Sequence, residues 1–421
     1  MPWDHSRSST SERIVATTVT HPALPSDLTG LRLGRAVLAY LAMMVAVITL
    51  SPFRFALEPV NAITGRWTVF DLVMNVGMFV PIGFIHQLSR PRGTKLAWRS
   101  ALAMGMGLSA LIEGAQFFAP ARVPSLADLA TNTAGAGVGA WLAARALGRV
   151  DAVRAVRAFG VELPLMGLVY ILAPLLWLVG LGSEGGARAW VLLPLTASAG
   201  WIMGTVFTSF DRTARPRLLL GTAVWLIVAL IPGSLASPGL VAAAGLTGLG
   251  AAWLRTVAPA RLTMEAVAEG RAPRRFEAPT LRVVLPLFFT YLAVSSLTPV
   301  EPPASAWSGT LALLPEGQRL TNAVIFRALE HIAAFTLTGY VIAEYHSRSL
   351  DRFRTVAPTV LGWAAALSCG LEVARGWHPG YGASALMFAL TLIAAGLGGW
   401  LYLLQLTHVR ALVAPRTTGP E

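Results

Sequence analysis

Long apolar stretches dominate this chain and leave it few ways to fold. The sequence is 55% hydrophobic and 13% charged, with a mean hydropathy of +0.61, whereas a soluble domain carries about 25% charged residues. A run of about 20 apolar residues crosses a bilayer as a helix. We therefore expect an all-α, polytopic transmembrane helical bundle of about 12 spans. The spans are predicted at residues 34–51, 69–88, 98–118, 125–144, 162–181, 189–208, 218–234, 238–254, 283–299, 322–342, 356–372 and 382–404.

The net charge of +12 follows the predicted topology. With the N-terminus inside, most Arg and Lys residues fall in cytoplasmic loops, as the positive-inside rule requires. Attraction to anionic lipid of the inner leaflet accounts for such a charge, so we expect no nucleic-acid partner. The chain is predicted to be a multi-pass protein of the plasma (inner) membrane with both termini cytoplasmic. Residues 1–33 are predicted to be a disordered cytoplasmic tail, 255–282 a cytoplasmic linker that could form an amphipathic helix, and 406–421 a second tail.

Cysteine chemistry is nearly absent from the sequence. Cys369 is the single cysteine, which excludes an intramolecular disulfide and a metal site built from several thiolates. No spacing of other ligand residues is typical of a metal site. We therefore expect no metal and no cofactor.

Polar and charged residues gather at the predicted outer end of the first four spans. Asp71 and Asn75 share one helix face at the start of the second span, as do Glu113 and Gln116 at the end of the third. Ser125-Leu-Ala-Asp128 resembles a capping box that opens the fourth span. Because such groups are costly in a bilayer unless paired or wetted, they indicate a candidate ligand-binding site. Its predicted residues are Arg54, Asp71, Asn75, Glu113, Gln116, Arg122, Asp128 and Asn132.

The last four spans, 283–405, repeat features of the first four, 34–145. Glu372, Ser384 and Trp400 follow Glu113, Ser125 and Trp141 at a constant offset. Eight spans separate the two starts, and an even number gives both copies the same orientation, so we expect two parallel four-helix repeats. Four further spans at 162–254, in which we find no motif, separate them. The second copy is predicted to be degenerate, because Tyr381, Met387 and Thr391 replace Arg122, Asp128 and Asn132.

These residues resemble the VanZ-like family. Its four-helix module has an Asp four residues before an Asn or His, then Glu-x-x-Gln, a loop Arg and Ser-x-x-Asp-x-x-x-Asn-x-x-Gly. The first copy fits each element, whereas the second keeps Glu372 and has His331 at the Asn/His position but Arg327 at the Asp position. The resemblance implies a role in the cell envelope and an association with low-level resistance to the glycopeptide antibiotic teicoplanin.

Three classes of function remain open from the sequence. The polar cluster could bind a lipid head group or an amphiphilic, lipid-linked envelope molecule at the outer leaflet, with Arg54 and Arg122 holding a phosphate or carboxylate. It could instead belong to a membrane enzyme that acts on a lipid-linked saccharide or phospholipid head group, or to a transporter. Alternatively, the same groups could form a polar network that holds the helices together, with the arginines paired to Glu113 and Asp128. The catalytic residues, if any, and the oligomeric state stay open.

Overall fold

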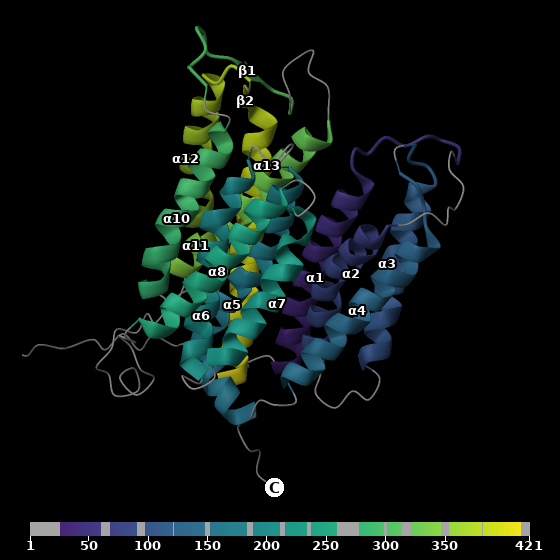
Figure 1. Ribbon diagram of the computed structural model, residues 1–421. Coiled ribbons are helices and arrows are strands. Elements are labelled where there is room, and N and C mark those ends of the chain that lie inside the picture. Colours follow the sequence, from purple (N-terminus) through teal and green to yellow (C-terminus); the bar gives the residue numbers. More distant parts are fainter. Residues whose placement is uncertain are drawn as a thin grey trace, which may run out of the picture.

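The helical prediction is confirmed by the fold. The computed structural model describes residues 26–59, 68–90, 97–120, 122–147, 152–182, 188–210, 215–233, 237–258, 278–298, 301–313, 321–346, 353–380 and 382–413. Within them, twelve α-helices stand roughly side by side (Figure 1). Most of the predicted tails and of the 255–282 linker, with its possible surface helix, lies outside the described residues.

The helices follow one another in three groups of four. The first group is α1 (Ser26–Leu50), α2 (Val69–Leu88), α3 (Ala97–Gln116) and α4 (Leu126–Leu147). The second is α5 (Ala152–Leu181), α6 (Leu192–Phe210), α7 (Arg215–Leu230) and α8 (Pro238–Val257), with short 3-10 helices η2 (Ala189–Val191) and η3 (Ile231–Gly233). The third is α10 (Ala278–Leu297), α11 (Asn322–His346), α12 (Phe353–Gly376) and α13 (Ala385–Val413). A parallel pair of two-residue strands, β1 (Gly309–Thr310) and β2 (Ala383–Ser384), closes one end of the third group.

Seven of the described helices are long and apolar enough to cross a membrane: α1, α2, α8 and α10 to α13. Shorter apolar stretches occupy α5, α6 and α7. The helices α1, α5 and α13 extend furthest beyond their predicted spans, each at the end that is predicted to be cytoplasmic. There α1 begins at Ser26 rather than at residue 34, because hydropathy marks only the apolar part of a helix. Its first turns instead pack on α13, where Thr29 Oγ1 and His408 Nδ1 lie 3.0 Å apart.

Within each group the second helix packs most closely on the fourth. These pairs are α2 with α4, α6 with α8, and α11 with α13. Each contact is made by a glycine: a Cβ at Gly83, Gly200 or Gly339 would collide with a backbone carbonyl oxygen of the partner helix. Small residues permit such close approach between membrane helices. The middle group, in which the sequence shows no motif, therefore shares this packing with the other two.

The Gly83 contact predicts a clear effect of one methyl group. Gly83→Ala should destabilise the protein by about 1–3 kcal/mol, because the new Cβ overlaps the Ala136 carbonyl oxygen and forces α2 and α4 apart. Gly107→Ala in α3 is the matched control, since a Cβ there has nothing within 4 Å. Thermal unfolding in detergent should show a lower midpoint for Gly83→Ala alone. Equal midpoints for the two variants would contradict the packing argument.

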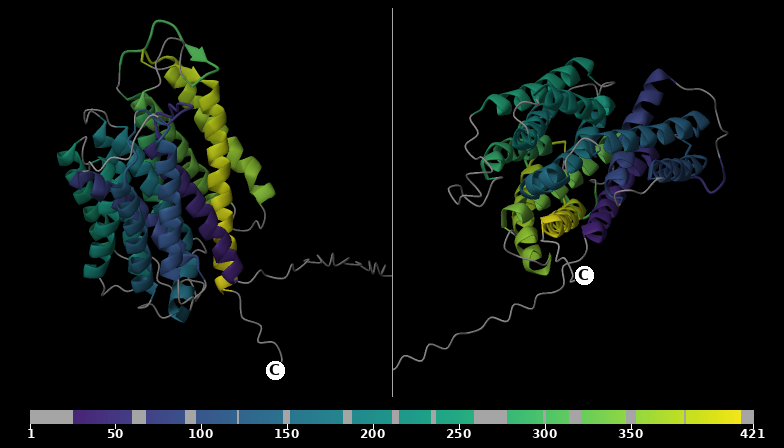
Figure 2. Two further views of the ribbon diagram at one scale, coloured as in Figure 1. Left: turned by 90° about the vertical axis from the view of Figure 1, so that its right-hand side faces the viewer. Right: turned by 90° about the horizontal axis from the view of Figure 1, so that it is seen from below.

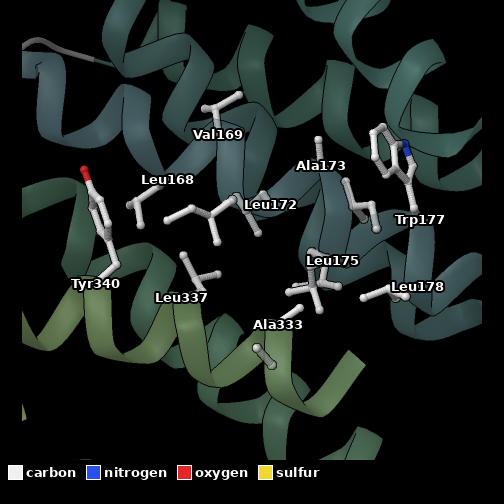
Figure 3. Close-up of a cluster of buried hydrophobic side chains, with 14 of the residues drawn as sticks. Leu168, Val169, Leu172, Ala173, Leu175, Trp177, Leu178, Ala333, Leu337 and Tyr340 are labelled. Carbon is white, nitrogen blue, oxygen red and sulfur yellow. The ribbon is translucent and has the colours of Figure 1, made fainter. Parts of the chain in front are cut away.

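Helix α5 forms the centre of the hydrophobic core. It packs on α11 and α13 of the third group, on α6 of its own group, and on α1. Leu168, Leu172 and Leu175 of α5 face Leu337 of α11 in a layer of buried side chains (Figure 3). Trp177 is fully buried in the same core and donates its indole N–H to the Val228 carbonyl oxygen at 3.0 Å. The core thus joins the middle group to the last one.

The first group stands to one side of this core and touches the third group through α1, which lies beside α13 (Figure 2). Because successive helices alternate in direction, α1 and α3 end where α2 and α4 begin. This end, predicted to be the outer one, lies on the same side of the bundle as β1 and β2, at the top of Figure 1. The eight predicted site residues belong to it.

Candidate functional site

Glu113 is placed by the turn between α3 and α4. Its side chain is buried, and its Oε2 accepts the backbone N–H of Ser125 at 2.7 Å. Ser125 in turn caps α4, because its Oγ accepts the N–H of Ala127 at 3.2 Å. The carboxylate therefore satisfies a backbone donor that the start of α4 would otherwise leave unbonded. The expected Ser125–Asp128 box is replaced by this arrangement, in which Glu113 takes the Ser125 N–H.

Arg122 and Gln116 hold the end of α1. Arg122 Nε donates to the Ser51 carbonyl oxygen at 2.9 Å, and its Nη2 donates to the Ile48 carbonyl oxygen at 3.3 Å. Gln116 Nε2 donates to the Thr49 carbonyl oxygen at 3.2 Å. The last carbonyl groups of a helix lack partners within it, and these contacts supply them. Burial lowers the pKa of Arg122 from its ordinary value, but arginine stays protonated in proteins, so a cation sits at the negative end of α1.

Asn132 lies one turn further into the bundle than Asp128. Its Nδ2 donates to Ser109 Oγ of α3 at 2.9 Å. The side chain is only 3% exposed, and its Oδ1 has no hydrogen-bond partner among the described residues. A buried carbonyl oxygen without a donor is costly, so the group is suited to accept a hydrogen bond from a bound molecule.

Asp128 lies within electrostatic reach of two other carboxylates at this end of the first group. Asp128 is half-buried and lies beside Asn75, within reach of a side-chain hydrogen bond. It is close enough to both Asp71 and Glu113 for their charges to repel. Asp71 is exposed and closes a capping box with Thr68, accepting its backbone N–H at 3.0 Å and its hydroxyl at 2.7 Å. We call Asp71, Asn75, Glu113 and Asp128 the acidic rim.

Arg54 lies in the segment after α1 and is not part of the acidic rim. It is exposed on the segment that follows α1, which is held down by a hydrogen bond from Ala56 N–H to the Phe118 carbonyl oxygen at 2.7 Å. No hydrogen bond or ion pair joins Arg54 to the acidic rim among the residues that the structure describes. The eight candidate residues thus divide into the acidic rim, the support of α1 by Arg122 and Gln116, the inner Asn132, and the exposed Arg54.

Two of these contacts had a signal in the sequence that the prediction did not use. Thr68-Val-Phe-Asp71 has the spacing of a capping box, and Ser109 lies one helical turn before Glu113 on the same face. The backbone carbonyl groups that bind Arg122 have no signature in the sequence.

The comparison with protein families covers this part of the chain. Residues 28–147 match the model of the VanZ/LLP1 family. The matched residues are those of α1 to α4, and we call these four helices the VanZ module. No curated protein and no solved structure matches the chain. With its apolar helices, the chain is therefore a membrane protein that carries a VanZ module at its N-terminal end.

Two contacts of the VanZ module have counterparts in the third group. Glu372 Oε2 accepts the backbone N–H of Ser384 at 2.7 Å, the same distance as between Glu113 and Ser125. Ser368 and Thr391, at the positions of Ser109 and Asn132, join their hydroxyl groups at 2.8 Å. The charges differ, however. Glu372 also accepts a 3.0 Å hydrogen bond from Arg375, which stands at the position of Gln116.

Proposed function

We propose that the acidic rim binds the positively charged group of an amphiphilic or lipid-linked envelope molecule at the outer surface of the membrane. The observation that carries this proposal is the position of Asp128, which lies beside Asn75 and within electrostatic reach of both Asp71 and Glu113. Like charges held together raise the free energy of the empty site, and a bound cation relieves the repulsion. Asn75 adds a side-chain amide beside Asp128. One turn deeper, Asn132 has an Oδ1 without a hydrogen-bond partner among the described residues.

An ammonium group suits this geometry. The described residues include no group of three or more His, Cys, Asp and Glu side chains placed to hold a metal ion. An ammonium group presents several N–H donors in different directions, so it can bond to separate carboxylate and amide oxygens. Arg122, which the sequence offered as a phosphate clamp, is committed to the Ser51 and Ile48 carbonyl groups. The apolar part of the ligand would then lie against the helices or in the lipid.

The predicted topology supports an outward-facing rim, with both termini in the cytoplasm. A surface site for an amphiphile is also compatible with the low-level resistance to teicoplanin-type glycopeptides that the family resemblance implies. The C-terminal group serves in this proposal as a repeat that keeps the scaffold, through Glu372 and Ser384, but lacks the rim. Arg327 and Met387 replace Asp71 and Asp128 there.

Binding of defined amphiphiles to the protein in nanodiscs tests this proposal. Phosphatidylethanolamine and teicoplanin would be the amine-bearing probes, and phosphatidylglycerol the probe without an amine. Asp128→Asn should weaken binding of an amine-bearing probe by about tenfold or more, since a hydrogen bond to a charged group contributes about 1.5–3 kcal/mol. Glu301→Gln, which changes an exposed carboxylate in the third group, is the matched control.

Several outcomes would contradict the proposal. Binding by folded Asp128→Asn equal to that of the unmodified protein would leave the rim with a structural role only. A preference for phosphatidylglycerol would indicate an anion site instead. Release of a labelled head group as a product during the incubation would indicate an enzyme, and intact recovery of the probe agrees with a binder.

A further inference from the structure

Glu344 is a buried carboxyl group for which the VanZ module and the acidic rim offer no role. It lies on α11, is only 2% exposed, and neither of its oxygens has a hydrogen-bond partner among the described residues. Glu330, on the same helix, is also 2% exposed but accepts bonds from Arg188 and Tyr291. The two glutamates thus share helix, burial and residue type, and differ in their partners. An isolated charge is unstable in such a place, so Glu344 takes up a proton instead.

The position of Glu344 places it far from the acidic rim. It follows Asn322, the first residue of α11, by 22 positions, which corresponds to about 33 Å along a helix. It therefore lies near the opposite end of the bundle, predicted to be the cytoplasmic one. The next residues, Tyr345 and His346, are exposed. The buried carboxyl group is thus followed directly by exposed residues at a helix end, where protons can be exchanged with water.

The surroundings of Glu344 suit a proton better than a metal ion. Tyr340, one turn earlier, lies close enough to interact electrostatically with Glu344, but its hydroxyl donates to Gln405 Oε1 at 2.8 Å. A Cβ at Gly167 of α5 would collide with both groups of this pair. The neighbouring oxygens are thus engaged and closely packed, whereas hard metal cations require six or more oxygen ligands. A proton requires one carboxyl oxygen and no extra space.

The titratable groups near this end belong to several helices. Tyr402 of α13 stacks edge to face on Tyr340 at 5.3 Å, and His408 of α13 lies 3.0 Å from Thr29 of α1. None of them forms a hydrogen bond with Glu344. The titratable residues near this end whose side chains the structure describes include Arg32, Arg35, Tyr40, Tyr170, Tyr340, Tyr345, His346, Arg354, Tyr402 and His408.

We propose that Glu344 is a reversible proton-binding site of the helical bundle, in exchange with the end predicted to be cytoplasmic. In the neutral form its O–H and C=O groups fit the closed packing between α11 and its neighbours α5 and α13. Release of the proton leaves a carboxylate without a partner, which must open the packing to reach water. The proposal does not depend on the acidic rim, and either can fail without the other.

Labelling with dicyclohexylcarbodiimide tests the proposal. This apolar reagent enters membranes and reacts with protonated carboxyl groups: the acid proton moves to a carbodiimide nitrogen, the carboxyl oxygen bonds to the central carbon, and rearrangement gives a stable N-acylurea. Mass spectrometry of peptides from the full-length protein in nanodiscs then locates the adduct. We expect labelling of Glu344 at least about tenfold above that of Glu330, whose carboxylate oxygens are engaged by Arg188 and Tyr291. Glu344→Gln should lose this adduct.

The pH dependence distinguishes reversible binding from a permanently neutral group. Labelling of Glu344 should fall as the pH is raised from about 6 to about 9.5, the range in which buried carboxyl groups release protons. The infrared C=O band of a protonated carboxyl group should disappear over the same range, and Glu344→Gln should lack it. Equal labelling of Glu344 and Glu330, no adduct at the lowest pH, or an adduct and a band that do not change with pH would each overturn the proposal.

Discussion

Replacing Arg188 with alanine should destabilise the protein by about 3–5 kcal/mol, because it leaves the Glu330 carboxylate buried without its cation. Arg188 Nη1 lies 3.2 Å from Glu330 Oε2 and its Nη2 lies 3.3 Å from Oε1, with both side chains almost fully buried. Arg188 Nη2 also donates to the Ser295 carbonyl oxygen at 3.0 Å, and the Tyr291 hydroxyl donates to Glu330 at 3.0 Å. The loss is measured as unfolding of the detergent-solubilised protein by a denaturing detergent.

The double variant Arg188→Met with Glu330→Leu separates the ion pair from the packing around it. Removal of both charges should recover much of the loss, since apolar side chains of similar volume often replace a buried ion pair at little cost. If the loss came from the missing contacts between the two side chains, and not from an unpaired buried carboxylate, Arg188→Ala and the double variant would be equally unstable. The pair joins the segment before α6 to α10 and α11, so its loss should weaken the contact of the second group with the third.

The sequence predicted the elements of this fold well because membrane helices are marked by their apolar length. The predicted span 69–88 coincides with α2 (Val69–Leu88), and the other predicted spans each overlap one α-helix. The ends of the helices were predicted less accurately, because α5 and α13 continue beyond their apolar parts. The shared packing of the middle group was not predicted. It rests on Gly200 meeting a backbone carbonyl oxygen, and a single glycine among 40 is no signal by itself.

The predicted topology brings the candidate site residues to one end of the first group, but it could not assign their partners. Arg122 and Gln116 bond to backbone carbonyl groups of α1, which every residue has and which no spacing reveals. Opposite charges nearby in the sequence suggested that Arg122 pairs with an acid. The carbonyl groups at the end of α1 compete for the same donors, because a buried helix end without partners is costly.

Long-range contacts between different groups were also beyond the sequence. Arg188 and Glu330 are 142 residues apart, and neither lies in a motif. Glu344 is similar, because its isolation can be seen only when the neighbours on α5 and α13 are known. In both cases the sequence shows a charged residue in an apolar helix, but the role of that residue depends on the side chains that neighbouring helices place around it.

Substitutions at Glu113 and at Glu372, its counterpart in the third group, should distinguish a structural role from a binding role. Glu113→Leu and Glu372→Leu should each cost about 2–3 kcal/mol of stability, because each removes the acceptor of a buried backbone N–H, that of Ser125 or Ser384. Glutamine keeps an acceptor oxygen at the same place, so Glu113→Gln should lose less stability than Glu113→Leu. Unfolding in detergent measures both comparisons.

Binding should distinguish the two positions where stability does not. Glu113→Gln removes from the acidic rim a carboxylate that repels Asp128, so it should weaken binding of an amine-bearing amphiphile severalfold. Glu372→Gln should leave that binding unchanged, because the third group has Arg327 and Met387 at the positions of the rim aspartates. If both glutamine variants weakened binding equally while remaining folded, the C-terminal group would contribute to the site, and the rim could not be its only part.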